Sequence, residues 1–157
     1  MVFLVYEVQI RKKYFPMYTL ETASIFATSP IDLSDSNVLF YFVDEVFATA
    51  LFIIMVLAIT DKKNDLQQPF VALFIGLALL TIGTSYGYNS GFALNPVRDF
   101  WPRVFTSLAG WGSSPFTACN YFFWIPLVGP MVGSLIATII YSLFISNHHR
   151  FESFQQF

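Results

Sequence analysis

The sequence predicts an all-α membrane protein with three transmembrane helices, one re-entrant half-helix and the tail end of a further helix at its N-terminus. Its 157 residues are 55% hydrophobic and only 11% charged, a more apolar composition than a soluble core requires. Three apolar runs are long enough to cross a bilayer, which takes about 20 residues of helix. A polar stretch containing glycine and proline separates the second run from the third. We therefore expect residues 1–157 to form one membrane domain.

The three spans are expected at about residues 38–60, 70–88 and 121–145. Residues 2–8 are apolar but too short to span, so we expect them to be the end of a further helix. They are not expected to be a signal peptide, because no basic region precedes them and no small-residue cleavage site follows. The more polar residues 9–37 are expected to form a long external loop or lid.

A short charged stretch stands between the second and third spans. Residues 66–97 and 104–147 carry no formal charge, so three charged side chains between them are isolated: Arg98, Asp99 and Arg103. Ionisable groups at membrane depth need a polar cavity or an aqueous path. The sequence therefore predicts that this stretch lines a pore.

A half-helix is expected to begin at Pro96. Asn95 is a strong N-cap, and proline suits the first helical position because that position needs no backbone N–H. The helix can run only to about Leu108 before the Gly110-Trp111-Gly112 turn, so it is about 20 Å long against a hydrocarbon core of about 30 Å. Such a helix is tolerated at membrane depth only when buried in protein or lining water, which favours a re-entrant segment. An extracellular amphipathic loop is the alternative.

Charge and cysteine content exclude several other classes of protein. A net charge of −2 without a basic run gives no reason to expect a nucleic-acid partner. The single cysteine, Cys119, cannot form an internal disulfide or a cysteine-rich metal site, and we expect it to be a small buried apolar residue. His148 and His149 have no nucleophile or metal-ligand partner at useful spacing. No enzyme activity, metal or cofactor is therefore expected.

The basic residues give a weak indication of orientation. Lys62 and Lys63 lie in the short turn between the first two spans, whereas residues 11–13 are basic and lie on the opposite side. Basic residues in long loops count less toward orientation, and Arg150 shares the side of Lys62. We therefore expect this turn and the C-terminus to be cytoplasmic.

Several motifs resemble the second half of an aquaglyceroporin, a member of the aquaporin or major intrinsic protein family. They are Gly83-Thr84-Ser85, Asn89-Ser90-Gly91, Asn95-Pro96-Val97-Arg98-Asp99, Pro102-Arg103 and Ala109-Gly110-Trp111-Gly112. The resemblance implies a six-helix channel built from two inverted repeats, each with a half-helix, that assembles as a homotetramer. This chain would hold the second repeat without the first.

The resemblance also implies which residues line the pore and its filter. Asn95 would be the mid-pore hydrogen-bond donor, and Arg98 would belong to the outer constriction, with Phe92 as its aromatic wall. Gly83 would be the filter position that needs no side chain, and Leu94 would line the path. A wide, partly flat constriction favours polyols over strict water selectivity. Asn95 as a purely structural cap and Arg98 reaching to lipid headgroups remain alternatives.

Other residues are implied to support the pore or to mark the polyol-conducting subtype. The supporting positions are Pro96, Val97, Asp99 and Glu45, and the subtype positions are Asp99, Pro126 and Leu127. Val97 replaces the alanine that usually follows Asn-Pro. Glu45 is expected to be buried and to hold the re-entrant loop, with a solvated carboxylate as the alternative, whereas Asp44 is expected to be merely interfacial. The spacing of Gly83, Gly87 and Gly91 would let helices approach closely, and this is the role expected for Gly87 and Gly91.

These observations predict a passive channel for glycerol, other small neutral solutes and water, present as an incomplete half that needs the missing repeat to conduct. We expect a multi-pass protein of the lipid bilayer, in the plasma membrane. The alternative is a non-conducting membrane protein that associates with full-length channels and modulates their assembly.

Overall fold

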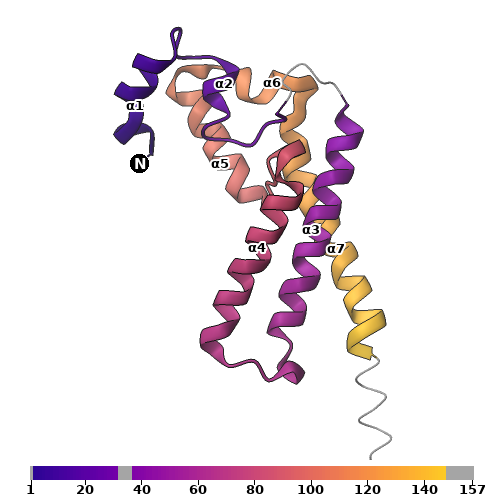
Figure 1. The fold of residues 1–157 in the computed structure, drawn as a ribbon. Coiled ribbons are helices and arrows are strands. Elements are labelled where there is room, and N and C mark those ends of the chain that lie inside the picture. Colours follow the sequence, from indigo (N-terminus) through magenta and orange to yellow (C-terminus); the bar gives the residue numbers. More distant parts are fainter. Residues whose placement is uncertain (1, 32–36, 148–157) are drawn as a thin grey trace, which may run out of the picture.

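The computed structural model describes residues 2–31 and 37–147, and the regular structure of this part is helical. Figure 1 shows the seven α-helices. They are α1 (Val2–Lys13), α2 (Leu20–Ala23), α3 (Val38–Thr60), α4 (Gln68–Ser90), α5 (Pro96–Thr106), α6 (Ser114–Tyr121) and α7 (Ile125–Tyr141). His148, His149 and Arg150, which entered the arguments on metal binding and orientation, lie outside the described residues.

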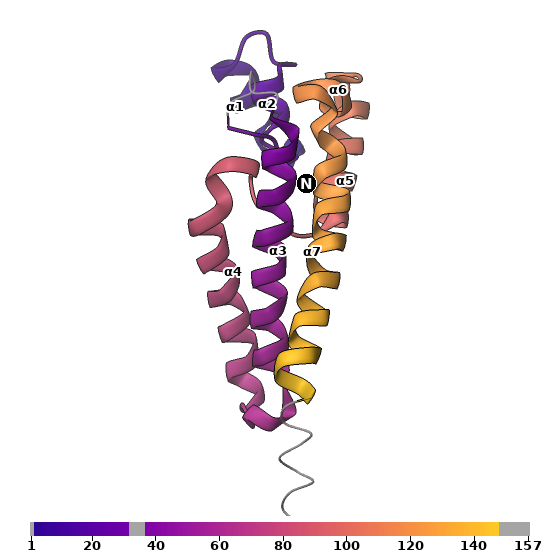
Figure 2. The ribbon, with the colours of Figure 1, turned by 90° about the vertical axis from the view of Figure 1, so that its right-hand side faces the viewer.

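Three long helical segments lie side by side and form a bundle (Figure 2). They are α3, α4 and the segment Ser114–Ser146, which contains α6 and α7, and each is long and apolar enough to cross a membrane. The backbone of the third segment leaves the helical conformation at residues 118–121, so α6 lies across the end of the bundle and α7 forms the straight part of the span. The three predicted spans are thereby confirmed, and the second extends further than predicted. The chain is an integral, multi-pass membrane protein.

The closest helix contact in the bundle lies between α3 and α7. A Cβ atom on Gly133 would lie 2.5 Å from the carbonyl oxygen of Val46 and 2.9 Å from Cβ of Thr49. One on Gly129 would lie 3.1 Å from Cβ of Glu45. Two glycines four residues apart therefore let α7 lie directly against the α3 backbone, as small residues do at many membrane-helix interfaces.

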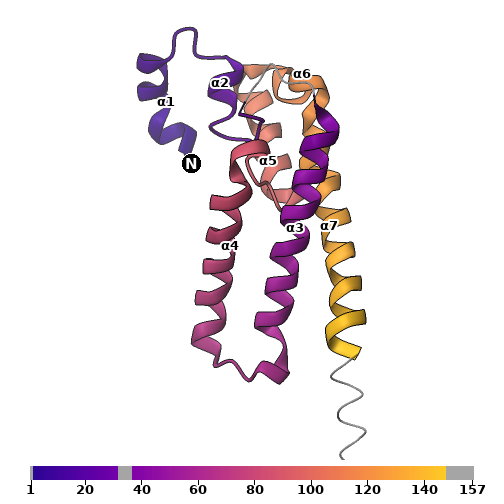
Figure 3. The same ribbon diagram turned by 45° about the vertical axis from the view of Figure 1, so that its right-hand side comes forward.

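The half-helix α5 begins at Pro96, as predicted. The side chain of Asn95 caps it, because its Oδ1 accepts hydrogen bonds from the backbone N–H of Val97 (2.9 Å) and of Arg98 (3.4 Å). The regular helix ends at Thr106, and a wide turn follows in which Gly110 has a φ of 126°. In Figure 3, α5 occupies only the upper part of the bundle, which agrees with a segment too short to span.

The N-terminal segment packs over the upper end of the molecule, near α5 and α6 (Figure 1). α1 continues to Lys13, so the expectation that a loop begins at residue 9 is wrong. An i, i+4 ion pair between Glu7 and Arg11 (2.8 Å) and three basic residues in the last turn favour this longer helix. The connection that follows contains α2, and it packs through Met17 and Ala23 onto Trp111.

Candidate functional site

The candidate site is the connection between α4 and α5, which crosses the middle of the bundle. Gly91 follows the last residue of α4 and has a φ of 82°, which suits glycine, and two further residues have positive φ values: Phe92 (41°) and Leu94 (54°). Side chains other than glycine adopt this region at a cost, so neighbouring groups must hold the backbone there.

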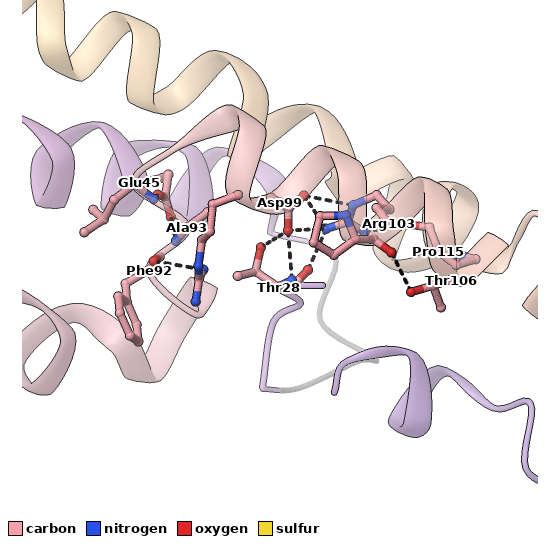
Figure 4. A network of polar contacts seen from close by, with 11 residues as sticks. Thr28, Glu45, Phe92, Ala93, Asp99, Arg103, Thr106 and Pro115 are labelled. Atoms are coloured by element: carbon pink, nitrogen blue, oxygen red, sulfur yellow. Dashed lines mark hydrogen bonds and ion pairs between the residues drawn. The ribbon is translucent and has the colours of Figure 1, made fainter. Parts of the chain in front are cut away.

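Glu45 provides much of this restraint. Its side chain is fully buried on α3, and its carboxylate accepts hydrogen bonds from the backbone N–H of Ala93 (3.3 Å) and of Leu94. Figure 4 shows this carboxylate beside the connection. The arrangement fits the expected buried carboxylate rather than the solvated alternative. Glu45 therefore fixes the approach of the chain into α5.

Asp44 contacts the end of α4, so the expectation that it is merely interfacial is wrong. Its Oδ2 lies 2.9 Å from Oγ of Ser90, and its Oδ1 accepts a hydrogen bond from Nδ2 of Asn89 (3.3 Å). The same Ser90 hydroxyl lies 3.0 Å from Oε2 of Glu45. A hydroxyl has only one proton to donate, so the two carboxylates share one donor.

The oxygen and the NH₂ group of the Asn95 side-chain amide differ in their hydrogen bonding. Its Oδ1 accepts the two capping hydrogen bonds, while its amide NH₂ donates to no other group in the part of the chain that the structure describes. Asn95 is exposed and lines a cavity. Capping and hydrogen-bond donation are therefore compatible roles, because they use opposite atoms of one amide.

Arg98 lies beside Phe92 one turn into α5. Its guanidinium donates a hydrogen bond to the carbonyl oxygen of Phe92 (3.3 Å) and stands 5.3 Å from the centroid of the Phe92 ring. This is within cation–π range, and most of the five guanidinium donors stay open. Arg98 is directed to a cavity rather than into the packed interior.

The ring of Phe92 lies on a flat surface formed by two glycines of α4. A Cβ atom on Gly83 would lie 3.2 Å from the ring, and one on Gly87 only 2.7 Å. The nearest atoms to both glycines belong to this ring and not to another helix. The nearest atoms to Gly91 belong to Thr28 and Ser29. The expectation that Gly87 and Gly91 serve helix contact is therefore wrong, and Gly129 and Gly133 serve it instead.

Two cavities meet at Arg98, which borders both. The outer cavity, of about 430 Å³, is lined by residues 24–31 together with Glu21, Gly87, Tyr88 and Gly91. The inner cavity, of about 500 Å³, is lined by Thr49, Phe52, Ile53, Leu79, Phe92, Ala93, Leu94, Asn95, Pro96, Pro130, Met131 and Ser134. Its wall thus combines apolar side chains with a few polar groups, a composition typical of small-molecule sites.

On the other side of α5, Asp99 and Arg103 form a buried ion pair. The guanidinium donates to both carboxylate oxygens at 2.9–3.0 Å, and the pair also holds Thr28 of the long connection. The sequence predicted that Asp99 and Arg103 belong to a stretch that lines a pore, which is wrong for these two residues, because they are buried against each other and line neither of the two cavities. No role was predicted for Thr28. The i, i+4 spacing could have indicated the ion pair, whereas nothing in the sequence indicates that Thr28 lies against it.

The remaining predicted residues lie apart from the cavities or at the tip of α5. Pro126 is buried at the start of α7, and neither Pro126 nor Leu127 lines either cavity. Val97 is 62% exposed at the tip of α5, and Cys119 is half-buried rather than buried. The described residues contain no group of three or more His, Cys, Asp or Glu able to hold a metal ion.

Comparison with known proteins identifies relatives of this architecture. Residues 5–141 match the family described as major intrinsic protein. The chain is 48% identical to aquaporin-9 of Homo sapiens over 130 residues, and 43% identical to aquaporin-10 of Homo sapiens over 131 residues. Each match covers 82% of this chain and 43% or 42% of the relative, so the chain spans less than half the length of these curated relatives.

A solved structure shares the arrangement of helices. The aquaglyceroporin from Plasmodium falciparum superposes with a TM-score of 0.79 at 29% sequence identity. The match covers 92% of this chain and 57% of that one. The predicted fold, one half of the aquaporin-like architecture, is thereby confirmed.

Proposed function

This chain belongs to the major intrinsic protein family, and we propose that it forms one half of a passive channel for glycerol, other small neutral solutes and water. One observation carries the proposal. Arg98 stands where two cavities meet, with an aromatic ring beside it and the open amide of Asn95 on the inner side.

The geometry suits neutral solutes with hydroxyl groups along one edge. The open donors of Arg98 replace part of the hydration shell of a hydroxyl, and the Phe92 ring faces the C–H edge. The cap fixes the amide of Asn95 as the next donor along the path. No bond is made or broken, so the proposal needs neither a catalytic residue nor a cofactor.

The same geometry disfavours cations. The N-terminus of α5 carries about half a positive charge, and the guanidinium of Arg98 adds a full one. Cations approaching from either cavity therefore meet an electrostatic barrier, whereas neutral solutes do not. Asp99, Pro126 and Leu127 resemble the residues of the polyol-conducting subtype, and the solved relative is an aquaglyceroporin, both of which support polyols as substrates.

A complete path requires a second half. The tip of α5 is exposed at Asn95 and Val97, and a polar helix end at membrane depth is costly in lipid. We assign residues 1–157 to the second inverted repeat and place a first repeat against this tip. The complete channel would assemble as a homotetramer in the plasma membrane, with the Lys62 turn and the C-terminus in the cytoplasm.

Stopped-flow glycerol uptake into vesicles tests the proposal. Vesicles would contain this chain alone, or this chain co-expressed with the first repeat of human aquaporin-9. We expect uptake above that of empty vesicles when both halves are present, and loss of that uptake in Arg98→Ala. Equal uptake in empty and loaded vesicles would contradict the proposal.

The exposed tip of α5 also allows the second candidate, a non-conducting chain that binds full-length channels. Co-purification with intact human aquaporin-9 and a change in its tetramer population, without any uptake in the mixture of halves, would favour this candidate.

A further inference from the structure

The wall of the outer cavity is a segment with little regular structure of its own. Residues 24–31 line this cavity, and residues 28–30 have no regular secondary structure. A backbone of this kind keeps its place only if other parts of the molecule hold it. Thr28 is the point at which this segment meets α5.

Every polar group of Thr28 is bound by the Asp99–Arg103 pair (Figure 4). Its backbone N–H donates to Oδ1 of Asp99 (2.8 Å), and its hydroxyl donates to the same oxygen. Its carbonyl oxygen accepts from Nη2 of Arg103 (2.6 Å). One residue is thus held by three hydrogen bonds to charged groups, which are about twice as strong as neutral ones.

The pair that binds Thr28 is itself rigid. Asp99 is 1% exposed and Arg103 4% exposed. Arg103 also donates through Nη1 to the carbonyl oxygen of Pro115, at the start of α6. Because Asp99 and Arg103 are almost fully buried, a solvent hydrogen bond replaces a lost partner poorly.

This binding site for Thr28 lies directly beside the residue that borders both cavities. Successive helical residues point about 100° apart, so Asp99 faces the loop while Arg98, one residue earlier, faces the cavities. On its other side, Thr28 meets the end of α4, where a Cβ atom on Gly91 would lie 3.3 Å from Cβ of Thr28. Thr28 therefore fixes the distance between residues 24–31 and the side chain of Arg98.

We propose that Thr28 is a positioning residue, held by the buried Asp99–Arg103 pair, that fixes the outer wall of the path in front of Arg98 and so limits the size of solute admitted. The role in solute size rests on the proposed channel function. The role in holding the loop does not, so the two can be tested separately.

Hydrogen exchange of the whole chain in lipid nanodiscs tests the holding role. Thr28→Val keeps the shape of the side chain and removes the hydroxyl donor. We expect the amides of residues 24–28, which donate hydrogen bonds in the structure, to exchange roughly tenfold faster, the factor for losing one hydrogen bond to a charged acceptor. Thr28→Ser keeps the hydroxyl and should restore slow exchange. Thr117→Val is the matched control, because this exposed hydroxyl bonds only the Ser113 carbonyl.

Solute selectivity in vesicles with both halves tests the second role. We expect Thr28→Val to raise the ratio of erythritol to glycerol uptake several-fold, and Thr28→Ser to keep the parent ratio. Unchanged exchange in Thr28→Val, or a Thr28→Ser variant as altered as Thr28→Val, would overturn the holding role. An unchanged ratio would overturn the role in size. Absence of all uptake would instead overturn the channel function, while the exchange result would still decide how the loop is held.

Discussion

The half-helix α5 and the α3–α7 contact are held by opposite means. α5 and the segments around it are fixed by buried polar groups, which include Glu45, Asp99 and Arg103. The α3–α7 contact is made by the absence of side chains at Gly129 and Gly133. Buried hydrogen bonds and ion pairs fix the position of each donor and acceptor, whereas packing at glycines fixes only the distance between two helices. The region around α5 therefore has the more precise kind of restraint.

Breaking the buried ion pair between Asp99 and Arg103 should lower the free energy of unfolding more than breaking any other contact in this comparison. Asp99→Ala leaves the Arg103 guanidinium buried without its carboxylate, which should cost about 3–5 kcal/mol in free energy of unfolding. Tryptophan fluorescence during unfolding in mixed micelles would measure the loss. Glu7→Ala breaks an i, i+4 pair at the surface and should cost less than about 1 kcal/mol. Equal losses of unfolding free energy in Asp99→Ala and Glu7→Ala would contradict the expected difference between a buried and a surface ion pair.

Glu45→Gln tests the second polar restraint. Replacing the carboxylate weakens the hydrogen bonds from Ala93 and Leu94, and should lower the free energy of unfolding by about 1.5–3 kcal/mol. Asp44→Asn is the matched neighbour and should cost less, because Asp44 is only half-buried. The same micelle measurement separates them. A larger loss in Asp44→Asn than in Glu45→Gln would show that Asp44, and not Glu45, provides the main restraint.

Gly133→Ala tests the packed contact. Its Cβ would lie 2.5 Å from the backbone oxygen of Val46, so the helices must separate, at a cost of about 1–3 kcal/mol. Gly76→Ala is the control, because nothing lies within 4 Å of its added Cβ and alanine favours the helix. If Gly133→Ala proves as stable as the parent, close packing does not hold α7 to α3.

Tyr141→Phe should have the smallest effect. The Tyr141 hydroxyl donates to Oδ2 of Asp61 (2.8 Å), a polar contact at the lower end of the bundle, far from α5. Hydrogen bonds between membrane helices contribute about 0.6 kcal/mol on average, so we expect a loss of that order. Tyr88→Phe, at a residue 73% exposed, should be neutral. A loss as large as that of Asp99→Ala would show that polar contacts matter equally throughout the bundle.

The sequence predicted the features that depend on local chemistry. The start of α5 follows from the cap at Asn95 and the proline after it, and the spans follow from apolar length. The prediction of helix contact at Gly87 and Gly91 was wrong, because glycine spacing on one helix does not say which neighbour fills the gap. The partner of Asp99 in the loop lies 71 residues away in the chain, and only the folded arrangement reveals it.

The seam between α3 and α7 has a consequence for biogenesis. The two helices are the first and last of the three long segments in the described part of the chain, yet they approach each other most closely in the bundle. This contact cannot be complete until the chain has been synthesised as far as Gly133, and it joins residues more than 80 positions apart, a kind of contact that slows folding. The carboxylate of Glu45 lies beside this contact between α3 and α7. The turn at residues 91–94, which Glu45 binds, therefore reaches its final conformation only after α7 has packed against α3.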